Sequence, residues 1–549
     1  MASVPVVSRL EEIYTEDAVP AQTKRWQHLL AEFEQRYGKP ADFVARSPGR
    51  VNVIGEHIDY SLYSVLPMAI TGDCIIAVGV GGAHERSADQ SERSEDAKDA
   101  KDWTVDIANV LPKFATHSFA FARDDPVAID ASVHEWTNYF KSGLRGALAM
   151  LREKGVVGGA HGPRSLQVVL DGTVPVGGGL SSSAAFTSCA ALAVLVANDA
   201  AHKDAIDKTA LTELAIVSER SVGVNSGGMD QSASVFSERG AALFVSFSPA
   251  LTARPVFFPA AATPETELCF VIAQSFVAAD KFVTGPVNYN LRVVECTLAA
   301  AYLNAVLNPP TTRLPSDKAP LGISLRGFHE TYFALQEKND PANTSLPRSQ
   351  KDQLRALLAL VDKHLPQEEG YTREEVAAVL NVTVDLLNQQ YMSQFPVRAE
   401  RFKLRQRAQH VFGEAARVLE FMDVLEGAKD SGGANSANAG ETLGETLGAL
   451  LNATQDSCRD LYECSCPELD ELCAIARRAG SYGSRLTGAG WGGCSVHLVP
   501  ANKVDAVKAA WEAEYYSKRQ PALTAEQRAA AVVVSRPGSG SAVFVGSSV

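Results

Sequence analysis

The hydrophobic positions along the chain follow two different spacings. Apolar residues at helical spacing predict helices over 22–38, 136–151, 184–197, 209–221, 288–306, 353–360, 401–425 and 503–514. Short apolar runs predict strands at 43–46, 74–80, 166–170, 241–247, 268–273, 495–499, 531–534 and 542–545. Because helices and strands intermix without the regular alternation of a barrel, we expect the layers of an α+β fold.

Two polar segments interrupt this pattern. Residues 81–102 are rich in Ser, Asp, Glu and Lys and have no apolar periodicity, which predicts an exposed insertion. Residues 430–448 are rich in Gly, Ala and Asn and contain a duplicated Glu-Thr-Leu-Gly, which we interpret as an expanded loop.

Length and charge limit the class of protein. A chain of 549 residues is long for one core, so two or more domains are expected. The net charge of −13 argues against a general binder of nucleic acids or anionic membranes, since both need positive fields. The polar start of the chain and the lack of a membrane-length apolar run favour a cytoplasmic protein. The nine cysteines then indicate reduced thiols, and the four between 458 and 473 lack the Cys-x-x-Cys spacing of a zinc site.

The stretch 175–185, Pro-Val-Gly-Gly-Gly-Leu-Ser-Ser-Ser-Ala-Ala, is the strongest local signal. A glycine-rich turn that leads into a helix N-terminus, here with a serine as the expected cap, can bind anions through free N–H groups and the helix dipole. The stretch lacks both the lysine of the Walker A motif and the last glycine of the dinucleotide fingerprint. A flexible loop before a core helix is the alternative.

Two further segments carry candidate chemistry. Arg50, Glu56, His57 and Asp59 fall within ten residues, and a strand end that leads into a loop would bring several of them into one site; a surface loop with a local ion pair is the alternative. Asp230 follows two glycines, so it can serve as a general base, a metal ligand or a helix N-cap.

Together these segments resemble a known family. Residues 49–60, Gly-Arg-Val-Asn-Val-Ile-Gly-Glu-His-Ile-Asp-Tyr, resemble the galactokinase signature, and Val65-Leu66-Pro67 continues it. Residues 174–184 resemble the phosphate loop of the wider GHMP small-molecule kinases, and 484–493 resemble their third motif. Three more segments resemble the fungal branch of galactokinases: 227–231, 288–292 and 462–467.

The resemblance implies a two-domain α+β GHMP kinase fold with the active site in the cleft between the domains. We expect an N-terminal domain over 22–225 and a C-terminal domain over 226–549, with the last strands, 528–549, as candidates for a return to the first domain. It also implies ATP-dependent phosphorylation of the anomeric C1 hydroxyl of D-galactose. The alternatives are an N-acetylgalactosamine kinase and a galactose- and ATP-sensing transcriptional transducer of the kind found in yeasts. The complete phosphate loop favours a working enzyme.

The resemblance also assigns roles to residues. Asp230 matches the base and Arg50 the arginine beside it. The residues that match the sugar site are Glu56, His57, Asp59, Gly228 and Tyr289. Those that match the ATP site are Gly177, Gly178, Gly179, Leu180, Ser181, Ser182, Ser183, Ala184 and Trp136, although Trp136 is equally a candidate core tryptophan. Ser183 and Glu219 match the Mg²⁺ ligands. The expected partners are galactose and ATP, the chain is expected to be a monomer, and a regulatory protein partner is left open.

Overall fold

The structure is a computed structural model. It describes residues 2–81, 103–122, 127–130, 133, 135–158, 162–199, 206–222, 227–259, 267–277, 284–394, 396–430 and 437–546. The predicted insertion at 81–102 and the expected domain boundary near 225 lie almost entirely outside the described residues.

A seven-stranded mixed sheet forms the larger layer, in the order β1-β13-β2-β3-β6-β4-β5. Its strands are β1 (Val6–Val7), β2 (Phe43–Ile54), β3 (Leu66–Gly81), β4 (Trp103–Asn109), β5 (His117–Phe121), β6 (Ser165–Gly172) and β13 (Ala542–Phe544). Strand β4 runs parallel to β6 and β1 parallel to β13, while the other pairs are antiparallel. The end of the chain therefore lies between two strands from its beginning.

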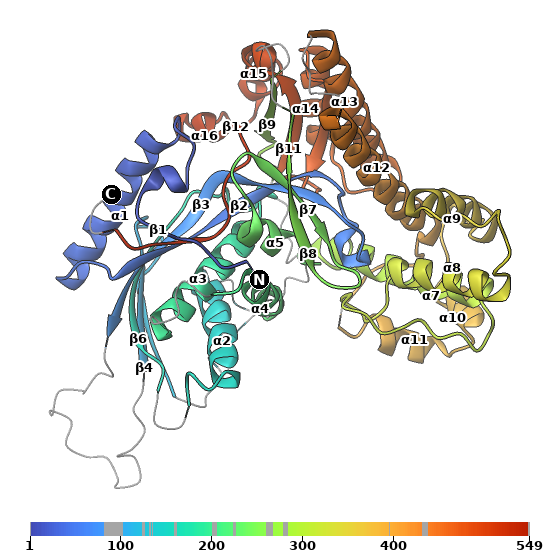
Figure 1. The fold of residues 1–549 in the computed structure, drawn as a ribbon, viewed down its shortest axis with the longest axis horizontal. Helices are drawn as coiled ribbons and strands as arrows, with labels where there is room; N and C mark the ends of the chain where they lie inside the picture. Colours follow the sequence, from blue (N-terminus) through green and yellow to red (C-terminus); the bar gives the residue numbers. More distant parts are fainter. Residues whose placement is uncertain are drawn as a thin grey trace, which may run out of the picture.

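Helices cover both faces of this sheet, as Figure 1 shows. On one face, α1 (Val19–Tyr37) buries Trp26, Leu29 and Phe33 at the helical spacing of the sequence. The other face carries α2 (Thr137–Glu153), α3 (Ser182–Asn198), α4 (Lys208–Arg220) and α5 (Met229–Phe236). Helix α3 is apolar on nearly all sides because it packs against the sheet and against α2, α4 and α5 at once.

A smaller antiparallel sheet has the order β10-β11-β9-β12. Its strands are β9 (Leu268–Gln274), β10 (Gly483–Thr487), β11 (Cys494–Pro500) and β12 (Val532–Ser535), and α14 (Pro467–Arg478) and α15 (Val504–Glu514) pack on it. The two strands near the chain end thus separate: β12 joins the smaller sheet and β13 joins the larger one. A hairpin of β7 (Ala241–Ser246) and β8 (Thr252–Phe257) packs beside β3.

Five further helices form a lobe at one end of the molecule (Figure 1). They are α7 (Tyr289–Leu307), α8 (Leu325–Asn339), α9 (Gln350–His364), α10 (Arg373–Leu380) and α11 (Val384–Tyr391). Two long helices, α12 (Leu404–Asp430) and α13 (Ala437–Asp460), lie side by side between this lobe and the smaller sheet. Among the described residues, no helix combines the length and apolar character needed to cross a bilayer.

Two predictions about local structure are wrong. The strand predicted at 43–46 continues to Ile54, and all twelve of its residues are buried. Residues 437–448 are the start of α13 and not a loop. Leu443 and Leu447 pack inward at a spacing of four, while a Cβ on Gly444 or Gly448 would overlap Tyr482. The glycines of this segment therefore allow close packing of a helix.

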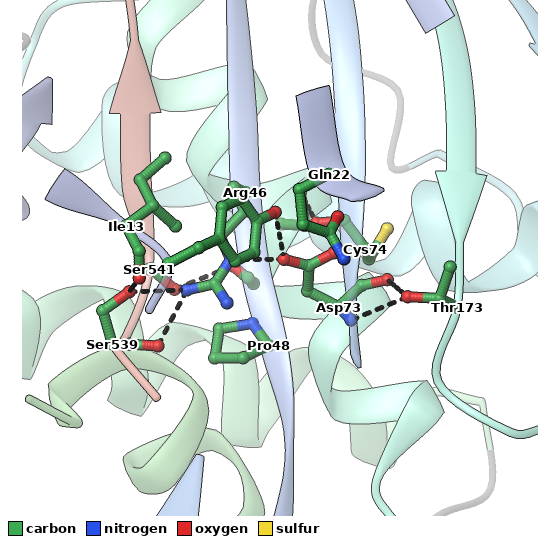
Figure 2. Close-up of polar contacts among 12 residues, drawn as sticks. Ile13, Gln22, Arg46, Pro48, Asp73, Cys74, Thr173, Ser539 and Ser541 are labelled. Carbon is green, nitrogen blue, oxygen red and sulfur yellow. Dashed lines mark hydrogen bonds and ion pairs between the residues drawn. The ribbon is translucent and has the colours of Figure 1, made fainter. Parts of the chain in front are cut away.

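A buried charge cluster fastens both ends of the chain to the larger sheet (Figure 2). Asp73 on β3 accepts hydrogen bonds from Tyr14 at 2.6 Å, from Arg46 on β2 at 2.6 Å and from Arg25 on α1 at 2.5 Å. Arg46 also donates to the carbonyl oxygen of Ser539 at 2.7 Å. Both oxygens of the carboxylate are thus paired with donors from distant parts of the chain.

Candidate active site

Three glycine-bearing turns that are far apart in the sequence meet in the structure. A Cβ on Gly49 would lie 2.7 Å from the carbonyl oxygen of Leu180, and a Cβ on Gly488 would overlap the carbonyl oxygen of Gly179. Gly179 and Gly488 also have positive φ angles, 72° and 83°. These contacts leave no room for a Cβ, and the positive φ angles also disfavour residues that carry one. Glycine is therefore needed where the turns touch.

The glycine loop before α3 presents backbone and hydroxyl groups. Gly177 has a φ of 72°, while Gly178 turns back so that its N–H donates to the carbonyl oxygen of Pro175 at 3.3 Å. Leu180 is buried beneath the loop. The loop leads directly to the N-terminus of α3, where unpaired N–H groups and the helix dipole favour an anion.

Serines occupy the start of α3. Ser181 holds the N-cap position in a left-handed conformation, with φ 62°, and its buried hydroxyl has no hydrogen-bond partner among the described residues. Ser182 and Ser183 follow as the first two helical residues; both are half-buried, and no described residue bonds to their hydroxyls. Ala184 faces the core. The hydroxyls therefore remain available to a ligand at the loop.

Arg50, in the middle of β2, joins this loop to α5. Its Nη1 donates to the carbonyl oxygen of Gly179 at 2.6 Å. Its Nε and Nη2 lie 2.8 and 2.7 Å from Oδ1 of Asp230. Since both contacts fall on Oδ1, no described residue donates to Oδ2, and the Asp230 side chain keeps 16% of its surface exposed. This carboxylate oxygen is available to a ligand hydroxyl.

Asp230 is not the cap of its helix, because Gly228, with φ 110°, holds the N-cap position of α5. Gly227 packs against Asp59 so tightly that a Cβ on it would lie 2.5 Å from Oδ2 of Asp59. The two carboxylates are near neighbours: burial and the negative charge of Asp230 raise the pKa of Asp59 to about 6. The site thus holds two acids and one arginine.

Glu56 is tied to the third glycine turn. Its Oε2 is paired with the fully buried guanidinium of Arg485 and accepts from the N–H of Gly488 at 3.1 Å. Arg485 also donates to the carbonyl oxygens of Asn52 and Val53 at 2.9 Å each. One oxygen of Glu56 therefore holds the first and third turns together.

His57 has both ring nitrogens in contact with the protein. Nδ1 lies 3.0 Å from the hydroxyl of Tyr60, and Nε2 lies 3.0 Å from the carbonyl oxygen of Ala489. The backbone at His57 is left-handed, with φ 60°. Tyr289, at the start of α7, lies beside its ring at 5.7 Å between centroids, and burial together with the charges of Asp59 and Asp230 raises the pKa of Tyr289. The structure thus brings all five residues of the predicted sugar site into one region.

The two remaining predicted residues lie on the helices around the loop. Glu219, at the end of α4, is buried and accepts a hydrogen bond from the side-chain amide of Gln231 on α5. Trp136, at the start of α2, is half-buried and stacks on Phe186 of α3 at 6.2 Å with an interplanar angle of 17°. No group of three or more His, Cys, Asp or Glu side chains in the described part of the chain is arranged to hold a metal ion.

Comparisons with known proteins agree with this arrangement. The model of the galactokinase galactose-binding signature matches residues 31–80, and those of the GHMP kinase N-terminal domain and C-terminal region match 138–238 and 438–518. A galactokinase of Saccharomyces cerevisiae is 41% identical over 94% of this chain and 94% of its own length. A galactokinase of Schizosaccharomyces pombe is 37% identical over 99% of each chain. The chain belongs to the galactokinase family.

A solved structure shares the fold of this chain. The structure of Lactococcus lactis galactokinase complexed with galactose superposes with a TM-score of 0.58 and covers 94% of this chain and 99% of that chain. At 22% identity this likeness concerns the fold alone. The predicted fold class, two-domain α+β of the GHMP kinase type, is confirmed.

Three residues around this galactokinase site were not predicted from the sequence. Arg485 lies within the third glycine turn, where a cation among glycines was an available signal. Tyr462 lies within a segment that resembles the fungal galactokinases, yet nothing local indicates that it reaches His57. Glu414, in the middle of α12, accepts from the N–H of Gly55 at 2.8 Å, and no pattern in its segment distinguishes it from a solvated helix residue.

Proposed function

We propose that this member of the galactokinase family transfers the γ-phosphoryl group of ATP to the C1 hydroxyl of D-galactose, giving galactose 1-phosphate and ADP. The observation that carries the proposal is the Arg50–Asp230 pair, held between the glycine loop and Asp59 with Oδ2 of Asp230 unbonded by described residues. Relatives that carry the galactokinase name along nearly the whole chain support the choice of sugar.

The glycine loop binds the triphosphate in this proposal. N–H groups of residues 177–184 and the positive end of α3 face the phosphate oxygens, while the stacked pair of Trp136 and Phe186 lies on the adenine side. Val176 is 82% exposed at the outer end of this loop, so it is free to cover the nucleotide. Phosphoryl transfer has a loose transition state, and the chain contributes mainly by positioning the reactants and stabilising charge.

Asp230 acts as the base toward the sugar. Its Oδ2 accepts the hydrogen bond of the C1 hydroxyl, and the hydroxyl proton moves to this oxygen as the new O1–Pγ bond forms and the bond from Pγ to the β,γ-bridging oxygen breaks. Arg50 pairs with Asp230 through two contacts to Oδ1 and also binds the loop carbonyl of Gly179. Arg50 therefore aligns the donor and acceptor sites with each other.

The sugar is held in this proposal by five residues: Asp59, Glu56, His57, Gly228 and Tyr289. The carboxylates accept from sugar hydroxyls, and the Tyr289 hydroxyl can donate or accept. One oxygen of Glu56 is paired with Arg485, so Glu56 offers its other oxygen to the sugar.

The residues present also fit Mg²⁺. The buried carboxylate of Glu219 and the hydroxyl of Ser183, on two helices that pack together, would supply the hard oxygen ligands that this ion prefers. When bound, Mg²⁺ neutralises charge on the β- and γ-phosphates.

A panel of sugars with ADP release as the readout tests the proposal. We expect rapid ADP release with galactose and much slower release with glucose and with N-acetylgalactosamine. A rate with N-acetylgalactosamine that equals or exceeds the galactose rate would overturn the choice of sugar. Absence of sugar-dependent ADP release with every hexose would overturn the assignment as an enzyme.

A further inference from the structure

Residues 461–464 lie in the short segment between α13 and α14, and arginine side chains hold this segment by hydrogen bonds to its backbone carbonyl groups. The carbonyl oxygen of Leu461 accepts from Arg407, and that of Tyr462 accepts from Nε of Arg292 at 2.7 Å. The carbonyl oxygen of Glu463 accepts from Nη2 of Arg292 at 3.2 Å. Two arginines thus fix three consecutive carbonyl groups.

The third glycine turn holds the same segment from the other side. The indole N–H of Trp491 donates to the carbonyl oxygen of Glu463 at 2.9 Å, and the backbone N–H of Trp491 donates to that of Cys464 at 2.7 Å. Glu463 itself has a left-handed φ of 53°, a conformation that a non-glycine residue adopts only when its surroundings enforce it. The segment is therefore clamped between α7 and α12 on one side and the active-site turn on the other.

The clamping arginines come from two helices, and both are buried together with Glu295, one of their counter-charges. Arg292 lies on α7 and Arg407 on α12. Nε of Arg407 is 2.6 Å from Oε2 of Glu295, and its Nη2 is 2.9 Å from Oε2 of Glu463. Arg407 and Glu295 are both buried, so removing Glu295 would leave the guanidinium of Arg407 without its buried counter-charge.

The clamp delivers one side chain to the sugar-facing segment. The ring of Tyr462 lies between the imidazoles of His57 and His410, at centroid distances of 4.9 and 4.2 Å. His410 holds the carbonyl oxygen of Glu56 at 2.9 Å, and His57 holds that of Ala489 at 3.0 Å. Tyr462 therefore separates two histidines that each hold a turn of the active site.

The hydroxyl of Tyr462 continues this arrangement as a chain of hydrogen bonds. It is paired with the hydroxyl of Tyr60 and lies 3.2 Å from Sγ of Cys296. Tyr60 in turn lies 3.0 Å from Nδ1 of His57. A carbonyl oxygen can only accept, so Nε2 of His57 carries a proton and donates it to Ala489. Loss of the Tyr462 hydroxyl removes the partner that orients Tyr60.

We propose that Tyr462 is a positioning residue for the sugar site, and that Arg292 and Arg407 transmit the placement of α7 and α12 to residues 56–60 through it. The inference rests on the proposed function, because it takes residues 56–60 as the sugar-holding segment. It assigns affinity for the sugar to a side chain that need not touch the sugar.

The test compares Tyr462→Phe with Tyr371→Phe. Tyr371 is a matched control because it is a fully buried tyrosine of the helical lobe whose hydroxyl accepts a hydrogen bond from the N–H of Gln367 at 3.3 Å. We expect Tyr462→Phe to raise the KM for galactose about five- to tenfold, the effect of about one hydrogen bond, while the KM for ATP stays within about twofold. Tyr371→Phe should change neither KM.

Two outcomes would overturn the proposal. One is a galactose KM of Tyr462→Phe within about twofold of the wild-type value, whatever the melting temperature does, because that result shows a purely structural role. The other is an equal rise in the KM values for galactose and ATP, because that result shows a general disturbance of the site. Arg407→Lys, which keeps the charge but not the fork of donors, should move the galactose KM in the same direction as Tyr462→Phe.

A binding measurement keeps this test separate from the proposed function. The rise in melting temperature of wild-type protein on adding galactose reports sugar binding without turnover. If wild-type protein binds galactose but does not phosphorylate it, the proposed function fails, and a smaller galactose-induced rise in Tyr462→Phe than in Tyr371→Phe still supports the positioning role. Equal rises in the two variants would contradict that role.

Discussion

Two buried clusters of charge share strand β2, and their arginines, Arg46 and Arg50, are only four residues apart. Around Arg46, the carboxylate of Asp73 has both oxygens paired, with two arginines and a tyrosine as donors (Figure 2). Around Arg50, Asp230 has one oxygen paired, and a second acid, Asp59, lies beside it. The first cluster is complete without a ligand, and the second has an excess of negative charge and an acid oxygen to which no described residue bonds.

The pKa values of the two clusters shift in opposite directions: that of Asp73 is lowered and that of Asp59 is raised. Burial alone would raise the pKa of Asp73, but the charges of Arg25 and Arg46 outweigh it and lower the pKa. Burial and the charge of Asp230 raise the pKa of Asp59 to about 6. The charges around Asp73 are paired within the chain, so this cluster stabilises the fold. The acids around Arg50 keep an excess of negative charge, which is typical of a site that binds a ligand.

The largest expected effect is on turnover, with Asp230→Ala. Removing the base should lower kcat by about 10³- to 10⁴-fold, because the C1 hydroxyl loses its proton acceptor. ATP binding should change little, since the glycine loop and α3 are untouched; equilibrium binding of a fluorescent ATP analogue checks this. Near wild-type sugar phosphorylation in the purified variant would show that the base assignment is wrong.

Asp73→Asn should give the second-largest effect, and on stability instead of turnover. The variant leaves two buried arginines without their shared counter-charge, so the free energy of unfolding should fall by about 3–5 kcal/mol. The kcat per folded molecule should stay within about twofold, as measured by activity below the unfolding transition. A variant that unfolds normally but loses turnover would contradict the division of roles between the clusters.

The next effect depends on pH. The pKa of Asp59 is raised to about 6 in the folded chain from an ordinary 3.8, so its ionisation destabilises the fold as pH rises through this window, by up to about 3 kcal/mol. Asp59→Asn should therefore be more stable than wild type at pH 8 and equally stable at pH 4, in denaturant titrations at both values. The contribution of Asp73 has the opposite sign and is lost as pH falls, because its folded-state pKa is lowered.

The smallest expected effect concerns hydroxyl groups. Ser541, near the Asp73 cluster, bonds to Ser47 at 2.7 Å and to the carbonyl oxygen of Ser234 at 3.0 Å, whereas no described residue bonds to the hydroxyl of Ser183. Ser183→Ala should raise the Mg²⁺ concentration needed for half-maximal rate by about tenfold, corresponding to about 1.4 kcal/mol. The control Ser541→Ala should lower the melting temperature by a few degrees at an unchanged Mg²⁺ requirement. Identical Mg²⁺ curves for Ser183→Ala and wild type would remove Ser183 from the ligand set.

The spacing of apolar residues predicted the helices and strands that bury only one face. The spacing of Trp26, Leu29 and Phe33 was sufficient for α1 because a single face of that helix meets the sheet. The full length of β2 was not predictable in this way, because Arg50 and Asn52 interrupt its apolar run and yet are buried by partners more than a hundred residues away. The start of α13 was not predictable from its local sequence either. There, tertiary packing against Tyr482 outweighs the low helix propensity of glycine.

The candidate site was predictable to the extent that its residues lie in motifs. Arg50, Asp59 and Asp230 come together as their motifs predict, and the structure adds which oxygen of Asp230 is paired. The contacts of Glu56 with Arg485 join segments more than four hundred residues apart. Such pairings depend on the closed fold, and neither propensity nor periodicity within a segment reports them.

The most direct measurement of the central claim is the position of the phosphate in the product. Wild-type protein, galactose, ATP and Mg²⁺ are incubated, and the product is examined by phosphorus–proton correlation NMR. With Asp230 beside the C1 hydroxyl and the glycine loop behind the γ-phosphate, phosphorus should show its three-bond coupling to the anomeric proton, with one ADP formed per sugar phosphate. A three-bond coupling to a proton at C6 or at any carbon other than C1, or ADP without sugar phosphate, would contradict the account.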